Sequence, residues 1–327
     1  MKKSPIEKKE FYNRIIYIKR DDLLSKEFSG NKARKFHYFL ENEFPDIKRV
    51  ISYGSSQSNA MCSISVLAKL RGWRFDYYVK HLSSYLQENP HGNYKYALKN
   101  GMHIHVGHDV PIPTKDDLFL EEGGRQKEAE HGLKILAQEI LEWKEEQGLK
   151  ELNVFLPSGT GTTALYLAKS FNTNEVARLK PSVPYMPSEF SESACLHPNY
   201  CIQKKSYLIG IEASPPTVFT VPCVGDREYL KEQFLMLEDN EDLHPTILVP
   251  TKKRHFGKLY RDSYKIWLEL QAKMGIEFDL LYDPQGWITL LDNPQIFEKP
   301  TLYIHQGGLI GNESMLARYI RKYGEDI

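Results

Sequence analysis

Short apolar runs alternate with amphipathic segments over residues 48–149. Strands that alternate with helices predict a parallel sheet covered on both faces. The pattern therefore predicts a smaller α/β unit that ends in a charged helix over about 126–147. Its strands are expected at 50–54, 74–80 and 103–106, and its shorter helices near 60–71 and 93–100.

A larger unit is expected to combine residues 1–47 with residues 150–327. Both units are predicted to be open parallel sheets, with a ligand site between them at the carboxyl ends of the strands. Residues 172–205 contain four prolines and no clear period, which indicates a long loop or insertion. Strands of the larger unit are expected near 153–157, 206–211, 217–221, 246–249 and 301–305, and helices near 226–238 and 258–274.

A small-residue turn places a lysine at the start of an amphipathic helix. Ser29 or Asn31 can cap this helix by accepting from an unpaired amide of the first turn. The positive helix end disfavours the ammonium form of Lys32 and so favours the nucleophilic amine, which a covalent bond to an aldehyde cofactor requires. Taken alone, the motif is more typical of a solvated basic turn. The apolar positions that follow it at helical spacing are Phe36, Phe39 and Leu40.

A strand, a Gly/Thr-rich turn and a helix start follow one another after residue 153. Backbone amides, threonine hydroxyls and the helix dipole there converge on one place, which is typical of a phosphate site. The turn also fits the dinucleotide-binding fingerprint, but the nearest acidic residue, Glu175, comes too early to be the one that this fingerprint requires. The turn is not a P-loop, because no Gly-Lys-[Ser/Thr] sequence ends it. A monophosphate fits best, against an ordinary strand-to-helix turn. The turn comprises Ser158, Gly159, Thr160, Gly161, Thr162 and Thr163.

A second small anion site is indicated at Ser55–Asn59, between a strand and a helix. Hydroxyl and amide groups at a helix N-terminus suit a carboxylate. One of these residues is expected to act only as the helix cap, because Ser and Asn are preferred there.

The segments Gly30–Lys35, Gln57–Asn59 and Ser158–Thr163 resemble, in order and spacing, the pyridoxal-phosphate (PLP) enzymes of the 1-aminocyclopropane-1-carboxylate (ACC) deaminase and D-cysteine desulfhydrase family. The upstream Lys19–Leu23, K-R-D-D-L, strengthens the resemblance. It spans most of residues 15–170 and returns from about 217. It implies the tryptophan synthase β-like fold, known as fold type II, with PLP between two open parallel-sheet domains.

The resemblance implies roles for individual residues. Lys32 would bond to the cofactor and move the substrate α proton, with Ser58 as a second catalytic residue that binds the substrate carboxylate and relays protons. Asn59 would hold the cofactor 3'-oxygen. Lys35 would supply counter-charge to the phosphate, around which Gly159, Thr160, Gly161, Thr162 and Thr163 would wrap.

The sequence departs from the family near the substrate. The family has tyrosines in a Tyr-Gly pair and in an Asp-Pro-Val-Tyr-Glu-Gly-Lys segment, and the matching positions here read His255–Gly257 and Tyr282–Trp287. Neither tyrosine is in register and the glutamate is absent, so Tyr282 is interpreted as a core residue unless a shifted backbone brings it to the ring. His305 either contacts the cofactor or bonds only to backbone.

These departures favour α,β-elimination from D-cysteine, because a thiolate leaves without help once the α proton is removed. ACC ring opening is the alternative. A PLP-binding protein without turnover and a nucleotide-binding oxidoreductase using the Gly159 turn are further hypotheses. Substrate chirality is left open.

Composition places few other demands on function. Acidic and basic residues balance at 43 each, which argues against nucleic acid or an anionic membrane as a partner. No apolar run suggests a signal peptide or a membrane span, so a cytoplasmic protein is expected. The expected partner is a small amino-acid substrate, and a homodimer is one option. No metal site is predicted, since Cys195, His197 and Cys201 match no common zinc spacing.

Overall fold

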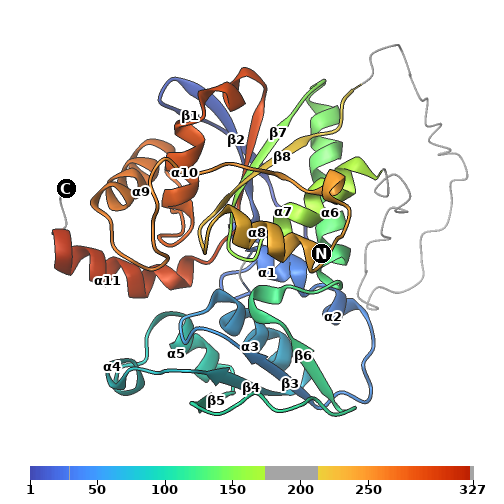
Figure 1. The fold of residues 1–327 in the computed structure, drawn as a ribbon, viewed down its shortest axis with the longest axis vertical. Helices are drawn as coiled ribbons and strands as arrows, with labels where there is room; N and C mark the ends of the chain where they lie inside the picture. Colours follow the sequence, from blue (N-terminus) through green and yellow to red (C-terminus); the bar gives the residue numbers. More distant parts are fainter. Residues whose placement is uncertain (29, 174–212, 325–327) are drawn as a thin grey trace, which may run out of the picture.

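The computed structural model describes residues 1–28, 30–173 and 213–324, which form two sheets with their own helices (Figure 1). The predicted α/β class with two open parallel sheets is confirmed, with one antiparallel strand added at an edge. Most of the expected insertion at 172–205 and the expected strand at 206–211 lie outside the described residues.

The larger sheet has six strands in the order β1-β2-β10-β7-β8-β9. All neighbours run parallel except β1 and β2, which form an antiparallel hairpin. Every residue of β7 and β10 is buried, as expected for parallel strands covered on both faces. The strands are β1 (Ile6–Phe11), β2 (Arg14–Arg20), β7 (Asn153–Ser158), β8 (Thr217–Pro222), β9 (Thr246–Ile247) and β10 (Thr301–His305).

Helices cover both faces of this sheet (Figure 1). One face carries α9 (Arg261–Met274), α10 (Asp283–Leu291) and α11 (Asn312–Tyr323), and the other carries α6 (Ala129–Glu146) and α7 (Thr162–Asn172), with α8 (Arg227–Leu235) packed on α7. Sequence analysis assigned the helix over 126–147 to the smaller unit, but the apolar stripe of α6 packs into the core of the six-stranded sheet. In the described part of the chain, no helix is both long and apolar enough to cross a bilayer.

The smaller sheet has four parallel strands in the order β5-β4-β3-β6. Its core contains β-branched and aromatic residues of the strands and the apolar face of α3. The short strand β6 was not predicted, because its four residues carry no clear period. The elements are β3 (Arg49–Tyr53), α3 (Asn59–Arg71), β4 (Arg74–Val79), α4 (Ser84–Glu88), α5 (Gly92–Lys99), β5 (Met102–Val106) and β6 (Asp117–Leu120).

The lysine-bearing helix is shorter than its apolar pattern predicts. It forms α1 (Gly30–Lys35), and a separate turn of helix, α2 (Tyr38–Glu41), follows. Phe36 and Phe39 are still buried, so the pattern correctly marked the inner face. Against α1 lies Gly132 of α6, where a Cβ atom would stand 2.0 Å from the carbonyl oxygen of Arg34. The two helices therefore touch through backbone.

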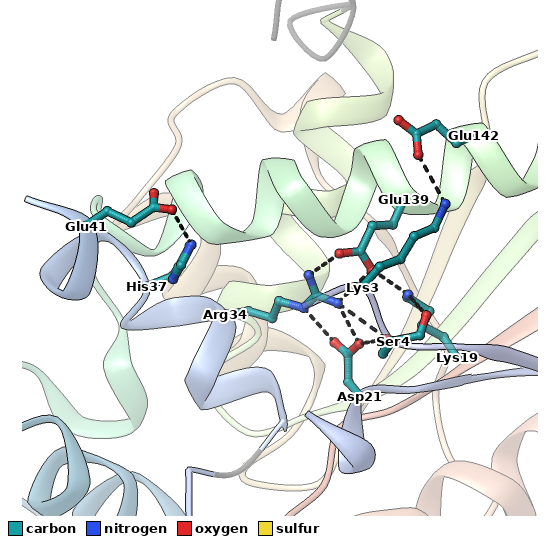
Figure 2. A network of polar contacts seen from close by, with 9 residues as sticks. All are labelled: Lys3, Ser4, Lys19, Asp21, Arg34, His37, Glu41, Glu139 and Glu142. Carbon is teal, nitrogen blue, oxygen red and sulfur yellow. Dashed lines mark hydrogen bonds and ion pairs between the residues drawn. The ribbon is translucent and has the colours of Figure 1, made fainter. Parts of the chain in front are cut away.

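A buried network of charged side chains fixes α1 to β2 and α6 (Figure 2). The guanidinium of Arg34 donates to Asp21 at 2.9 Å and to Glu139 at 2.7 Å, and Lys19 donates to Glu139 at 2.5 Å. Although burial alone would raise it, the charge of Arg34 holds the pKa of Asp21 below its ordinary value. Two cations and two anions balance within the network, which reduces the desolvation cost of burying them.

We expect Gly132→Ala to lower the free energy of unfolding by about 1–3 kcal/mol, because overpacking at a backbone contact outweighs the roughly 1 kcal/mol by which alanine favours a helix. Urea denaturation measures the change. Glu145→Ala, on the exposed side of the same helix, serves as the control and should change stability by less than about 0.5 kcal/mol. A Gly132→Ala protein as stable as the parent would contradict the close contact.

Candidate functional site

A cavity of about 520 Å³ lies at the carboxyl ends of strands from both sheets. Its walls are formed by residues that follow β3, β6, β7, β8 and β10, together with α1. This size is within the range typical of small-molecule sites. All nine residues that the sequence singled out line this one cavity: Lys32, Lys35, Ser58, Asn59, Gly159, Thr160, Gly161, Thr162 and Thr163.

Lys32 is held in the cavity wall by contacts that link the start of α1 to the end of β10. The backbone amide of Asn31 donates to the carbonyl of Gln306 at 3.0 Å, and the two side chains bond at 2.9 Å. Nζ of Lys32 donates to Oδ1 of Asn31 at 3.2 Å. Burial lowers the pKa of Lys32 to about 8, while the nearby Asp279 opposes the shift. The expected bias toward the neutral amine is present, and burial is its main cause.

Lys35, one turn further along α1, is almost fully buried. Its Nζ donates to the carbonyl of Gly123 at 3.0 Å. Burial, and then the charge of Lys32, lower the pKa of Lys35 well below its ordinary value. An anion bound in the cavity would favour the ammonium form of both lysines.

The Gly/Thr turn runs from the end of β7 into α7. Gly161 stands at the N-cap with φ of +70°, and a Cβ there would lie 2.3 Å from Phe234, so only glycine fits. No side chain caps α7, which leaves its first amides to other partners. Thr160 and Thr162 lie 3.1 Å apart through their hydroxyls, and the buried hydroxyl of Thr163 has no hydrogen-bond partner among the described residues.

Ser58 and Asn59 lie at the start of α3. Oγ of Ser58 accepts from the amides of Ala60 and Met61 at 3.1 and 3.4 Å, so this serine is the expected helix cap. Its hydroxyl proton is still able to donate. Asn59 accepts from Asn93 at 2.6 Å through Oδ1, which leaves its amide group as a donor in the cavity wall.

Further residues that were not assigned to the site also line the cavity, among them Asp279, Tyr282 and Asp283. Tyr282 was interpreted as a core residue, but its hydroxyl edge faces the Gly159 turn, where a Cβ would lie 3.4 Å from it. A tyrosine-carboxylate pair is therefore present. The sequence comparison placed the family's Asp-Pro on Asp283-Pro284. An alignment that places the family's Tyr-Glu on Tyr282-Asp283 identifies this pair from the sequence.

The two carboxyl groups are buried without a cationic partner in hydrogen-bond contact. Asp279 accepts from the amides of Leu281 and Tyr282 through Oδ1, and its Oδ2 has no partner in the part of the chain that the structure describes. Burial raises the pKa of Asp279 to about 7. Asp283 accepts from the Tyr303 hydroxyl at 2.5 Å, and burial followed by the charge of Asp279 raises its pKa well above the ordinary value.

His305 does not line the cavity. Its Nε2 lies 2.7 Å from the carbonyl of Glu277, and its Nδ1 accepts from the amide of Gly307 at 3.2 Å. Of the two interpretations left open by the sequence, the one in which this histidine bonds to backbone is the one observed.

No protein-family model and no curated protein matches the chain. Solved structures match it over nearly its whole length. An ACC deaminase homologue superposes with a TM-score of 0.70 at 18% identity, covering 98% of this chain and 94% of that chain. An L-serine ammonia-lyase from Rhizomucor miehei gives 0.60 at 10% identity with 98% of both chains covered. A serine racemase from Dictyostelium discoideum gives 0.58 at 11% identity, with 94% and 92% covered.

The chain therefore has the fold of these deaminase, ammonia-lyase and racemase enzymes. This is the fold-type II class that the sequence resemblance implied, and that prediction is confirmed at the level of the fold.

The depressed pKa of Lys32 predicts how its reactivity depends on pH. In the chain freed of bound small molecules, acylation of Lys32 should increase with pH and level off above a midpoint near 8, because only the neutral amine reacts. Asp279→Asn should move the midpoint lower, since it removes the charge that stabilises the ammonium. Mass spectrometry of the Lys32 peptide measures both. Asp239→Asn, at an exposed position, is the control, and an equal shift in both variants would contradict the assigned cause.

Proposed function

We propose that the cavity binds PLP and that the chain is a PLP-dependent enzyme acting on a small amino acid. The observation that carries this proposal is the position of Lys32, an amine of lowered pKa, on the same cavity as the Gly/Thr turn at the start of α7. An aldehyde bonded to the amine and a phosphate held by the turn are the two ends of one PLP molecule.

The turn fits the phosphate. Uncapped amides at the start of α7 and the unpartnered hydroxyl of Thr163 supply donors without acceptors. Gly159, Thr160 and Thr162 add further amides and hydroxyls at the same wall. Lys35 lines the cavity as well and supplies positive charge once an anion raises its pKa.

PLP, when bound, withdraws electrons from Cα of an amino acid and so makes the α proton acidic. Lys32 then takes that proton at Nζ, since burial favours the neutral amine at this position. Ser58 donates its hydroxyl proton to a substrate carboxylate oxygen, because its lone pairs are used by the backbone of α3. The free amide group of Asn59 would donate to the cofactor 3'-oxygen and so orient the ring.

The favoured reaction is α,β-elimination from D-cysteine, in which D-cysteine and water give pyruvate, ammonia and hydrogen sulfide. The C–S bond breaks after the α proton has left, and the thiolate carries away the electron pair. Such a leaving group needs no acid from the protein. The site therefore requires only the lysine, the ring-holding residues and a carboxylate subsite.

A second candidate is favoured by Tyr282, which lines the cavity beside Phe256, with their ring centroids 5.0 Å apart. Burial raises the pKa of Tyr282 above its ordinary value, so its hydroxyl keeps its proton. A protonated hydroxyl suits the opening of a strained carbon ring, in which ACC and water give 2-oxobutanoate and ammonia and a ring carbon must be protonated.

Replacement of Lys32 tests the proposal. Purified protein should be yellow and should release keto acid and ammonia from one member of a panel containing D- and L-cysteine, D- and L-serine and ACC. Lys32→Ala should lose the absorbance band and at least about 10³-fold in turnover, as losses of covalent catalytic residues commonly do. Lys127→Ala, at an exposed lysine, should match the parent. A yellow parent that turns over no substrate would instead identify a PLP-binding protein without activity.

Tyr282→Phe distinguishes the two candidate reactions. The variant keeps the ring and loses only the hydroxyl, so elimination from D-cysteine should fall by less than about tenfold, while ACC turnover should fall by about 10²–10⁴-fold as expected for a general acid. Assays of keto acid, with sulfide measured for cysteine, provide the comparison. Equal loss on both substrates would show that the hydroxyl positions the cofactor and is not specific to ring opening.

A further inference from the structure

A cluster of two histidines and one glutamate lies outside the lining of the cavity described above. His37 stands between the two helices, Glu41 ends α2, and His131 lies on the first turn of α6. Their ligand atoms lie within 4.8 Å of one another. No pattern in the sequence marks this cluster, because His131 is separated from the other two by about ninety residues.

The contacts within the cluster centre on the carboxylate. Nε2 of His37 lies 2.8 Å from one oxygen of Glu41 (Figure 2), and Nε2 of His131 lies 2.6 Å from the other. The contact of His37 is close, yet Nε2 does not make a hydrogen bond of acceptable geometry to any partner in the described structure. The His37 side chain is 9% exposed, so solvent does not readily supply one. His37 Nε2 is therefore a buried nitrogen that lies beside a carboxylate oxygen without bonding to it, and in the tautomer protonated at Nδ1 it is able to bind a cation.

The side-chain chemistry of the cluster suits a cation. Two imidazoles and one carboxylate, from α2, the residue before it and α6, each offer one ligand atom. Neutral imidazole and carboxylate are ligands that Zn²⁺ accepts.

We propose that His37, Glu41 and His131 form a zinc site, with water as the fourth ligand. Tetrahedral Zn²⁺ with bonds of about 2.0–2.1 Å needs ligand atoms about 3.3 Å apart. Each imidazole nitrogen already lies within this distance of a Glu41 oxygen. The two imidazole nitrogens need to approach each other by no more than about 1.5 Å to reach it. His131 and Glu41 are partly exposed, so rotation of their side chains provides this movement without a change in the backbone.

The site joins the segment that directly follows the lysine-bearing helix to α6. Gly132, adjacent to His131, makes the closest backbone approach between α6 and α1, so the two helices are already in position for a shared ion. Zinc bound there would hold the end of α1 against α6. The ion is structural in this arrangement, since none of its ligands lines the cavity that contains Lys32.

Equilibrium dialysis of tag-free protein, carrying whatever cofactor it is purified with, against ZnCl₂ tests the site, with bound zinc measured by plasma mass spectrometry. The parent should retain one zinc per chain. His131→Ala and Glu41→Gln should bind at least about tenfold more weakly, because loss of an outer-shell partner alone costs about 10–100-fold. Zinc should also raise the melting temperature of the parent and not of these variants.

His103→Ala is the matched control, since His103 is an exposed histidine on β5 remote from the cluster in sequence, and it should bind zinc as the parent does. Both test positions are partly exposed, so the variants are expected to fold, which circular dichroism checks. Parent protein that binds no zinc, or zinc retained equally by His131→Ala and Glu41→Gln, would overturn the proposal.

Discussion

The pairing of Arg34 with Asp21 and Glu139 is the constraint on which the rest of the structure depends. All three groups lie where water does not reach them, and a buried charge without its partner costs several kcal/mol. Arg34 can therefore satisfy both carboxylates only when α1, the end of β2 and α6 occupy one relative arrangement. Lys32 and Lys35 share a six-residue helix with Arg34, so the same pairing fixes where their amines lie.

The cavity has the opposite electrostatic character. Its lining includes Lys32, Lys35, Asp279 and Asp283, and in the described structure none of these four forms an ion pair within contact distance. Burial moves the pKa of each toward its neutral form. The charged groups of the Arg34 network are paired with one another, whereas those of the cavity are not. A charged ligand is able to form ion pairs and hydrogen bonds with such unpaired groups, in addition to fitting the shape of the cavity.

The sequence was sufficient where the determinants are local. Period and turn residues located most of the parallel strands, though not the four-residue β6. The strand-turn-helix signal located the anion turn that ends at Thr163, because all its donors come from one short segment. The break after Lys35 was not visible, since neither glycine nor proline marks it in the sequence. Tyr282 and Asp279 were missed because their place in the cavity depends on how the segment before α10 folds back over the Gly159 turn. The two histidines of the proposed zinc site meet only through the packing of α6 on α1.

The position of β10 affects how the molecule is made. This strand, the last in the chain, lies between β2 and β7, near the middle of the six-stranded sheet. A nascent polypeptide that has not yet reached residue 301 therefore exposes two unpaired inner edges, one on the N-terminal hairpin and one on β7, and such edges readily pair with other chains. The four-stranded unit has all its strands by residue 120 and can form on the ribosome. The six-stranded sheet, and with it the contact between Asn31 and Gln306, must await synthesis of nearly the whole protein.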